Sequence, residues 1–220
     1  MEVQEAFEKL TKGRLVEGYG LTEASPVTHA NPLSEKRKVG TIGVPLPSTE
    51  AVIVDLARRT KEVKQGQIGE LAVRGPQVML GYWKESRATK EVLTDDGWLL
   101  TGDVAARDEE GYYRLVGRLK DLVISGGENV YPAELENVLH EHAAVGEAAV
   151  VGVPDERWGE ACLAFVVLAD GESAREDELL AFCRERLARY KVPREVRFVD
   201  ALPRNALNKV AKSELLELVR

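Results

Sequence analysis

The chain has 220 residues, of which 44% are hydrophobic, so it can hold one large domain or two small ones with packed cores. Its formal net charge of −7 argues against a nucleic-acid partner, because no basic excess is present to neutralise phosphates. Cys162 and Cys183 lack CxxC spacing, and we expect both to be small core residues in a reducing compartment. The sequence contains no transmembrane stretch and no signal peptide, so we expect a cytoplasmic protein.

Residues 1–40 begin with an amphipathic helical pattern and continue into a glycine-rich turn. Residues 15–16 predict a short strand that runs into this turn. The turn carries the ring of Tyr19, the hydroxyl of Thr22 and the carboxylate of Glu23. Such groups can stack on a base, bond a phosphate oxygen and hold Mg²⁺. An ordinary loop with a buried tyrosine accounts for the same residues.

Residues 41–117 show the pattern of a β-rich segment. The apolar runs 51–54 and 68–74 predict strands, and a hairpin is expected around the turn at 108–111. Many short strands separated by turn residues predict a small distorted antiparallel β-barrel. Asp103 follows a glycine at a predicted strand boundary, where its two oxygens can bond a ribose diol. An aspartate that closes a turn is the simpler interpretation.

The stretch 117–136, GRLKDLVISGGENVYPAELE, combines early charges, an apolar strand, a glycine pair and a helix start. Gly126 and Gly127 interrupt the strand, and Pro132 suits the first turn of a helix. Backbone N–H groups ahead of a helix start often meet ligands. We therefore predict a hinge between two structural units with a ligand near the glycine loop. On local features alone, a plain strand–turn–helix connection is the favoured interpretation.

Residues 118–220 alternate helix and strand, which predicts a compact α+β unit. Three apolar, β-branched runs predict strands. These runs are 148–153, 162–168 and 196–199. A capping box at 173–176 predicts a helix start. Lys209 lies in a polar loop before a terminal helix, where an ammonium group can reach into a cleft and bind developing negative charge. An ordinary surface lysine is the simpler interpretation.

Taken in order, these motifs resemble the adenylate-forming enzymes, a superfamily of acyl-CoA synthetases, luciferases and peptide-synthetase adenylation domains. The matching stretches cover nearly the whole chain. They are YGLTE (19–23), GWLLTGD (97–103), GRLKD (117–121), SGGENVYPAELE (125–136) and PRNALNK (203–209). The segments at 46–50 and 75–83 most resemble bacterial long-chain fatty-acid–CoA ligases. The resemblance implies that ATP, a fatty acid and CoA give acyl-CoA, AMP and pyrophosphate through an acyl-adenylate.

For the nucleotide, the resemblance implies a site built from residues far apart in the sequence. The residues implied to bind ATP or AMP are Tyr19, Gly20, Thr22, Asp103 and Arg118. Tyr19 would stack on adenine, and Thr22 would bond the phosphate. Asp103 would bind the ribose hydroxyls, with Arg118 nearby. Glu23 would hold Mg²⁺.

For the C-terminal residues, the resemblance implies a lid that swings about a hinge at Lys120 and Asp121. Lys209 would bridge the carboxylate and the α-phosphate during adenylation, so the catalytic residues implied are Lys209, Thr22 and Glu23. After the swing, one loop would line the pantetheine tunnel of coenzyme A. Its residues are Ser125, Gly126, Gly127 and Glu128.

Two departures from the family pattern bear on these expectations. The family normally has glycine before the catalytic lysine, and this chain has Asn208, which tolerates left-handed backbone angles better than most residues. The family's chain is much longer, with its phosphate loop and most of its acyl pocket upstream. We therefore expect a remnant of a large domain at 1–40, a β-barrel subdomain at 41–117 and a lid domain at 118–220. This part is expected to need the missing N-terminal half before it adenylates a fatty acid.

The sequence is also compatible with a non-catalytic fragment or a partner-binding module. It is equally compatible with a ligase of the same superfamily that acts on a different carboxylic acid. A homodimer is one option for the oligomeric state of the chain. A peripheral position at the inner membrane surface is one option for its location in the cytoplasm.

Overall fold

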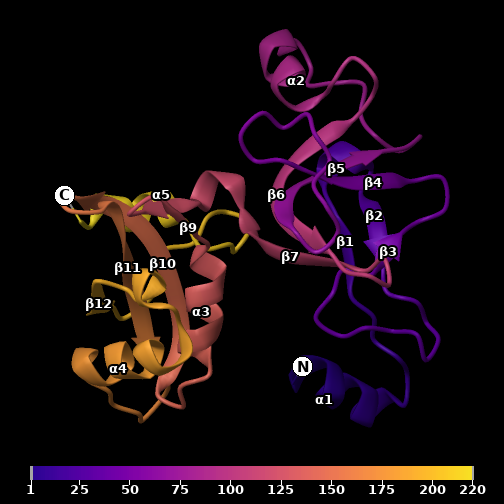
Figure 1. Ribbon diagram of the computed structural model, residues 1–220. Helices are drawn as coiled ribbons and strands as arrows, with labels where there is room; N and C mark the ends of the chain where they lie inside the picture. Colours follow the sequence, from indigo (N-terminus) through magenta and orange to yellow (C-terminus); the bar gives the residue numbers. More distant parts are fainter. Residues whose placement is uncertain (1, 220) are drawn as a thin grey trace. The chain divides into compact units, whose positions relative to one another are not determined.

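A computed structural model describes residues 2–219. Its contacts divide the chain into two units, and the boundary falls between Leu119 and Lys120 in the sequence (Figure 1). The 3-10 turn η2 (Leu119–Asp121) carries this boundary. Both units combine helices with mainly antiparallel sheets, so the predicted α+β class is confirmed. No helix among residues 2–219 is long and apolar enough to cross a membrane.

The first unit is built from short strands. Its elements are α1 (Glu2–Thr11), β1 (Gly18–Gly20), the 3-10 turn η1 (Thr22–Ala24), β2 (Val27–Ala30), β3 (Val44–Pro45), β4 (Glu50–Val54), β5 (Ile68–Arg74), α2 (Ser86–Val92), β6 (Leu99–Arg107) and β7 (Tyr113–Arg118). They form one antiparallel sheet in the order β1-β2-β3 and another in the order β4-β5-β6-β7. The strand predicted at 15–16 is wrong, because pairing with β2 begins only at Gly18.

The core of the first unit lies on one face of the four-stranded sheet. Alternate residues of β5, Leu71 and Val73, are fully buried there and pack in one cluster with Leu99 and Tyr113. The Tyr113 hydroxyl donates a hydrogen bond of 2.7 Å to the carbonyl of Ala51, so the one polar atom of this large side chain is satisfied. Burial is continuous from Gly69 to Val73, so both faces of β5 are covered, and Leu71 and Val73 mark the face that carries this cluster.

The predicted small distorted antiparallel β-barrel is not found as a closed barrel, because the four-stranded sheet stays open. Its edge strands β4 and β7 do not pair with each other in the described residues. Segment 42–43 occupies the edge of β7 by exchanging backbone hydrogen bonds with Tyr113, and segment 61–63 occupies the edge of β4. Short connecting segments already pair with backbone groups of both edge strands. The sheet therefore does not need a β4–β7 ladder to satisfy these edges.

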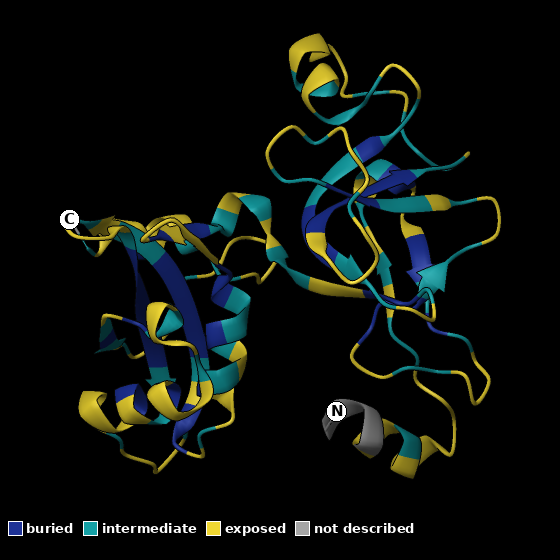
Figure 2. Ribbon diagram, in the orientation of Figure 1, coloured by how far each residue is buried: buried dark blue, intermediate teal, exposed yellow. Residues whose placement is uncertain are grey.

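The second unit is a sheet covered on both faces by helices. Its elements are β8 (Val123–Ser125), β9 (Glu128–Val130), α3 (Pro132–His140), β10 (Val145–Asp155), β11 (Gly159–Leu168), α4 (Glu176–Arg186), the 3-10 turn η3 (Arg189–Lys191), β12 (Glu195–Phe198) and α5 (Lys212–Glu217). The sheet runs β10-β11-β8-β9, and β12 pairs with β11 in parallel. The three predicted strands are found as β10, β11 and β12. Figure 2 shows that burial is concentrated on the long strands of this sheet.

Two apolar clusters hold the helices of the second unit to its sheet. On one face, Leu135 of α3 and Leu179 of α4 pack against Val150 and other strand residues. On the other face, Leu215 of α5 packs against Phe165. Cys162 and Cys183 lie in the first cluster, as predicted for small core residues. Burial raises the pKa of the Cys162 thiol to about 12.

The capping box predicted at 173–176 is wrong by two residues. Helix α4 begins at Glu176, and its box is formed by Glu178, whose carboxylate accepts a hydrogen bond of 2.9 Å from the Arg175 backbone N–H. The Glu176 side chain is engaged elsewhere, because it accepts a hydrogen bond of 3.1 Å from the backbone of Val196 on β12. The acidic residue thus ties the helix to the sheet instead of closing the helix start.

The glycine pair forms the two-residue turn of the β8–β9 hairpin. Ser125 pairs with Glu128 across this turn, and φ is +61° at Gly126 and +87° at Gly127. Positive φ at both central residues is the signature of a type I′ turn. The predicted strand–turn–helix order is therefore wrong here, because β9 lies between the glycine pair and α3.

Replacing Gly126 by alanine is expected to destabilise the chain more than replacing Gly127. Both changes put a Cβ at positive φ, which costs about 1–2 kcal/mol. Only the new Cβ at Gly126 would also meet a ring, at 2.7 Å from Trp158 Cε3, whereas nothing lies within 4 Å at Gly127. Urea unfolding of the two variants measures the difference in free energy, and equal losses would show that Trp158 moves aside without cost.

Candidate functional site

Tyr19 and Asp103, which are 84 residues apart, meet in the first unit. The Tyr19 hydroxyl donates a hydrogen bond of 2.6 Å to Asp103 Oδ2, and Arg118 Nε lies 3.0 Å from Asp103 Oδ1. The pairing of β6 with β7 sets Asp103 opposite Arg118, so strand register brings this ion pair together. Asp103 is only 6% exposed, while Arg118 is exposed to solvent. Three residues predicted for the nucleotide therefore form one cluster.

Asp103 lies inside strand β6, not at the strand boundary that the sequence predicted. The ladder between β5 and β6 is irregular at this point, and Gly102 has a φ of +72°. Thr101 bridges the irregularity, because its hydroxyl donates a hydrogen bond of 2.7 Å to the carbonyl of Leu71 and accepts one of 3.1 Å from the Asp103 N–H. A kink in a strand is a common means of turning a side chain toward a site.

Tyr19 is held in the protonated form that donates to Asp103. Burial raises the pKa of the Tyr19 phenol well above its ordinary value, and the hydrogen bond to Asp103 raises it further. On its other side the ring meets the edge of His29 at 6.0 Å between centroids, and His29 in turn meets Tyr113 at 4.8 Å. Burial lowers the pKa of His29 to about 4, so this packed imidazole is neutral near pH 7. Sequence reasoning missed His29, since a lone histidine in a short strand carries no signal.

Thr22 and Glu23 lie on η1, directly after a glycine that the turn requires. A Cβ at Gly20 would lie 2.1 Å from the carbonyl oxygen of Pro26, so no other residue fits there. The Thr22 side chain is exposed and makes no hydrogen bond within residues 2–219. Both the backbone and the side chain of Glu23 are hydrogen-bonded. Its carbonyl accepts a hydrogen bond of 2.8 Å from the Met79 N–H, and its carboxylate accepts one of 2.8 Å from the Tyr82 hydroxyl.

Glu23 is the residue of this turn that can hold a divalent cation. Among the described residues there is no group of three or more His, Cys, Asp or Glu side chains placed to hold a metal ion. Mg²⁺ does not need one, because it commonly binds through one or two carboxylates together with substrate phosphates and water. A single half-buried carboxylate beside an exposed threonine hydroxyl therefore fits Mg²⁺ that arrives with a nucleotide.

In the second unit, a tight loop presents Lys209 to solvent. The side chain of Asn205 accepts hydrogen bonds of 3.0 Å from the N–H groups of Leu207 and Lys209, and its backbone N–H bonds the Lys209 carbonyl at 2.9 Å. Asn208 adopts a φ of +60°, so the prediction that asparagine can take the left-handed position before the lysine is confirmed. Arg204 braces the loop by donating to the Asn208 carbonyl at 2.9 Å. The loop thus has a defined shape without the usual glycine.

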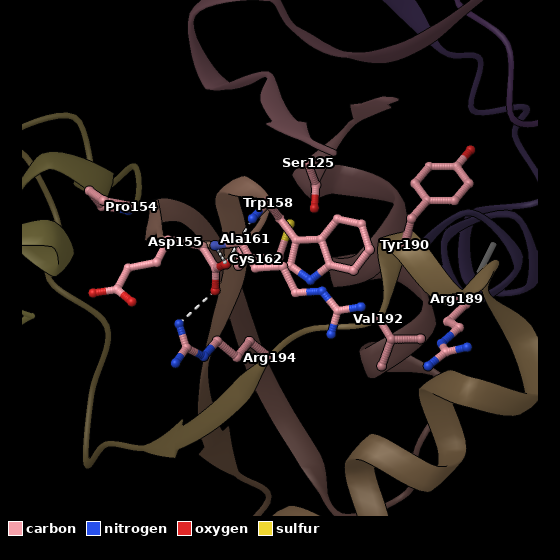
Figure 3. Close-up of a pocket in the computed structure, with 12 residues that line it drawn as sticks. Ser125, Pro154, Asp155, Trp158, Ala161, Cys162, Arg189, Tyr190, Val192 and Arg194 are labelled. Carbon is pink, nitrogen blue, oxygen red and sulfur yellow. Dashed lines mark hydrogen bonds and ion pairs between the residues drawn. The ribbon is translucent and has the colours of Figure 1, made fainter. Parts of the chain in front are cut away.

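A pocket of about 930 Å³ opens beside the glycine turn of the second unit (Figure 3). Its walls include the rings of Trp158 and Tyr190, which are 48% and 41% exposed. Three guanidinium groups also line it. They belong to Arg157, Arg189 and Arg194. Ser125 lines the pocket too, and the Gly126 N–H donates a hydrogen bond of 2.8 Å to the Trp158 carbonyl.

Asp155 organises this pocket. One carboxylate oxygen accepts hydrogen bonds of 2.9 Å from the N–H groups of Arg157 and Trp158. The other accepts from Arg194 Nη1 at 2.6 Å, as the dashed line in Figure 3 shows. These donors, the backbone groups first, lower the pKa of Asp155. Sequence reasoning named Ser125 at this pocket but missed its aromatic and basic residues, because they come from two separate loops with no recognisable spacing.

The residues predicted to form a hinge lie where the second unit begins. Lys120 is its first residue, is exposed and belongs to η2 together with Asp121. Ser125 is buried, whereas Gly126, Gly127 and Glu128 are exposed. The swing predicted about Lys120 is a motion, so it stays a prediction.

Two family models match this chain. The model described as AMP-binding enzyme matches residues 1–83, and the model described as AMP-binding enzyme C-terminal domain matches residues 134–209. The chain belongs to the AMP-binding enzyme family. The order of the two matches agrees with the order of the motifs that carried the resemblance.

Relatives with solved structures or curated functions cover almost the entire chain. It is 51% identical over 218 residues to the long-chain-fatty-acid–CoA ligase of Bacillus subtilis, a match that covers 99% of this chain and 38% of that protein. It is 50% identical over 202 residues to the feruloyl-CoA synthase of an Amycolatopsis species, and this match covers 91% of this chain and 40% of that protein. The crystal structure of ATP-bound MatB from Rhodopseudomonas palustris matches with a TM-score of 0.90 at 39% identity. This match covers 99% of this chain and 43% of the MatB chain. The chain thus spans about two fifths of the length of these relatives and corresponds to a C-terminal portion.

Proposed function

We propose that the chain is the C-terminal part of an acyl-CoA synthetase. In the first half-reaction, ATP and a carboxylic acid give an acyl-adenylate and pyrophosphate. In the second, CoA displaces AMP and acyl-CoA is formed. The observation that carries this proposal is the cluster of Tyr19, Asp103 and Arg118, because the motifs predicted these residues for one nucleotide. The proposal includes a need for the remaining portion of such a ligase, since the chain spans 38% of its Bacillus subtilis relative.

The adenosine would bind at the Tyr19–Asp103 cluster. A carboxylate has about four lone-pair positions, and Tyr19 and Arg118 use one on each oxygen of Asp103. Positions therefore remain to accept both hydroxyls of a ribose diol. The Tyr19 ring is fixed by its hydroxyl and by His29, so it offers adenine a preformed face. The backbone at Gly20 and the free Thr22 hydroxyl would then face the phosphates.

Two positively charged groups would offset the negative charge on the phosphates. Mg²⁺ held by Glu23 would supply positive charge when it is bound. The ammonium group of Lys209 would bind the carboxylate and the α-phosphate, which gathers negative charge during attack. The rigid loop around Asn205 supports this role, because it fixes the backbone from which the lysine side chain extends. Lys120 and Asp121 would act as the hinge between the two half-reactions.

The pocket beside the glycine turn would take the nucleotide end of CoA. The exposed rings of Trp158 and Tyr190 could stack on the adenine of CoA, and the guanidinium groups could bind the phosphates of CoA. The volume of about 930 Å³ is within the range of sites for ligands of this size. Ser125, Gly126, Gly127 and Glu128 would line the path of the pantetheine arm, and the bond from Gly126 to Trp158 joins that path to the pocket.

The acid is proposed to be a long-chain fatty acid, because the Bacillus subtilis relative at 51% identity is named for that substrate. A different carboxylic acid is the second candidate. The feruloyl-CoA synthase is 50% identical, and a difference of one per cent does not separate an aliphatic acid from an aromatic one.

The 220-residue chain is expected to bind AMP, and Asp103→Asn is expected to weaken binding by about tenfold or more, because a hydrogen bond to a charged group is lost. Isothermal titration calorimetry measures both affinities. Asp95→Asn is the matched control, since it removes an exposed carboxylate that makes no ion pair in the described residues. A wild-type chain without affinity for AMP would instead favour a non-catalytic, partner-binding module.

Trp158→Ala is expected to weaken CoA binding by about tenfold, which is the contribution of one stacked base. It should leave AMP affinity unchanged, because its ring lines only the pocket of the second unit. Trp83→Ala removes a tryptophan that is 86% exposed in the first unit and serves as the control. Equal CoA affinity in both variants would argue against this pocket as the CoA site.

A further inference from the structure

Strand β6 leaves the regular ladder of its sheet at the residues that lead to Asp103. Ala72 of β5 pairs with Leu100, and Glu70 pairs with Val104. Between these two pairs, β6 has residues 101–103 and β5 has only residue 71. The N–H of Gly102 therefore lies outside the ladder in a partly buried position, where an N–H without an acceptor costs free energy.

The side chain of Glu70 supplies the missing acceptor. Glu70 Oε1 accepts a hydrogen bond of 2.8 Å from the Gly102 N–H. This carboxylate is 0% exposed, and its charge is balanced by Arg59, whose Nη2 donates to Oε1 at 2.6 Å and whose Nε contacts Oε2. Both oxygens of Glu70 are thus engaged, one of them by the backbone of the kink.

Stability alone is a weak reason for a charge in this place. Replacing a buried ion pair by packed apolar residues is often neutral or stabilising. The face of the sheet on which Glu70 lies could accept such residues, because Val54 opposite it is aliphatic. What an apolar residue could not do is bond the Gly102 N–H. The bond to Gly102 is therefore the property that distinguishes Glu70.

We propose that Glu70 is a positioning residue for the nucleotide site. By holding the Gly102 N–H, it fixes the kink that turns the next residue, Asp103, toward Tyr19 and Arg118. Arg59 orients the Glu70 carboxylate by contacting both of its oxygens. The name of the ligand rests on the proposed function, but the positioning of Asp103 is independent of it.

The test compares Glu70→Gln with Glu70→Met in the ligand-free 220-residue chain. The two side chains are similar in length, but only glutamine keeps an oxygen that can accept from Gly102. Amide exchange of Gly102, followed by NMR, should stay near the wild-type rate in Glu70→Gln. In Glu70→Met it should rise by about tenfold or more as the hydrogen bond is lost.

A second readout follows Asp103 through Tyr19. The Asp103 carboxylate helps to raise the pKa of the Tyr19 phenol, so loss of its orientation should lower that pKa in Glu70→Met and not in Glu70→Gln. An alkaline absorbance titration measures this, with Tyr19→Phe to identify the transition. A merely structural role for Glu70 would reduce stability without moving the Tyr19 pKa.

Unchanged Gly102 exchange and an unchanged Tyr19 pKa in Glu70→Met would overturn the proposal. If Glu70→Met does not fold, Glu70→Asp replaces it, because aspartate keeps the charge but is too short to reach Gly102. Gly102 should then be protected in Glu70→Gln and exposed to exchange in Glu70→Asp, and the reverse order would overturn the proposal. A wild-type chain that fails to bind AMP would sink the proposed function and leave this test in place.

Discussion

The first unit depends on two partners of one buried carboxylate, one joined to it by a hydrogen bond and the other by an ion pair. Asp103 is nearly inaccessible, and burial of an unpaired charge is expensive. The hydroxyl of Tyr19 and the guanidinium of Arg118 provide the compensation, one to each oxygen. Because Tyr19 belongs to the three-stranded sheet and Asp103 to the four-stranded sheet, this interaction ties the two sheets together at the candidate nucleotide site.

A chain of rings continues the same connection into the core. Tyr19 meets His29, and His29 meets Tyr113, whose backbone bonds Ile42 and Gly43 at the edge of β7. The site is therefore backed by the segment that also covers the β7 edge of the open sheet. In the second unit, Asp155 has a similar role. Its carboxylate accepts hydrogen bonds from two backbone N–H groups and one guanidinium group beside a pocket. In both units one carboxylate organises groups from separate segments.

Local sequence patterns predicted the individual strands and helices well, but they predicted poorly how distant segments pair at the edges of the sheet. Strand β5 and the hairpin of β6 and β7 were found because apolar runs and turn residues act over short distances. The barrel was predicted wrongly because the segments that cover the sheet edges have no strand pattern of their own. Motif order predicted Tyr19, Asp103 and Arg118, but a glutamate in a strand is ordinarily expected to face solvent. Glu70 therefore could not be identified until its register and burial were known.

One chimera tests most directly whether this chain completes an adenylate-forming site. The C-terminal portion of the Bacillus subtilis long-chain ligase would be replaced by this chain, to which it is 51% identical. We predict fatty-acid-dependent ATP–pyrophosphate exchange that falls by about a hundredfold or more in Lys209→Ala. Lys90→Ala, which removes an exposed lysine of α2, should leave the rate unchanged. A folded chimera without exchange, or a Lys209→Ala chimera as fast as its parent, would contradict the proposed role of this chain.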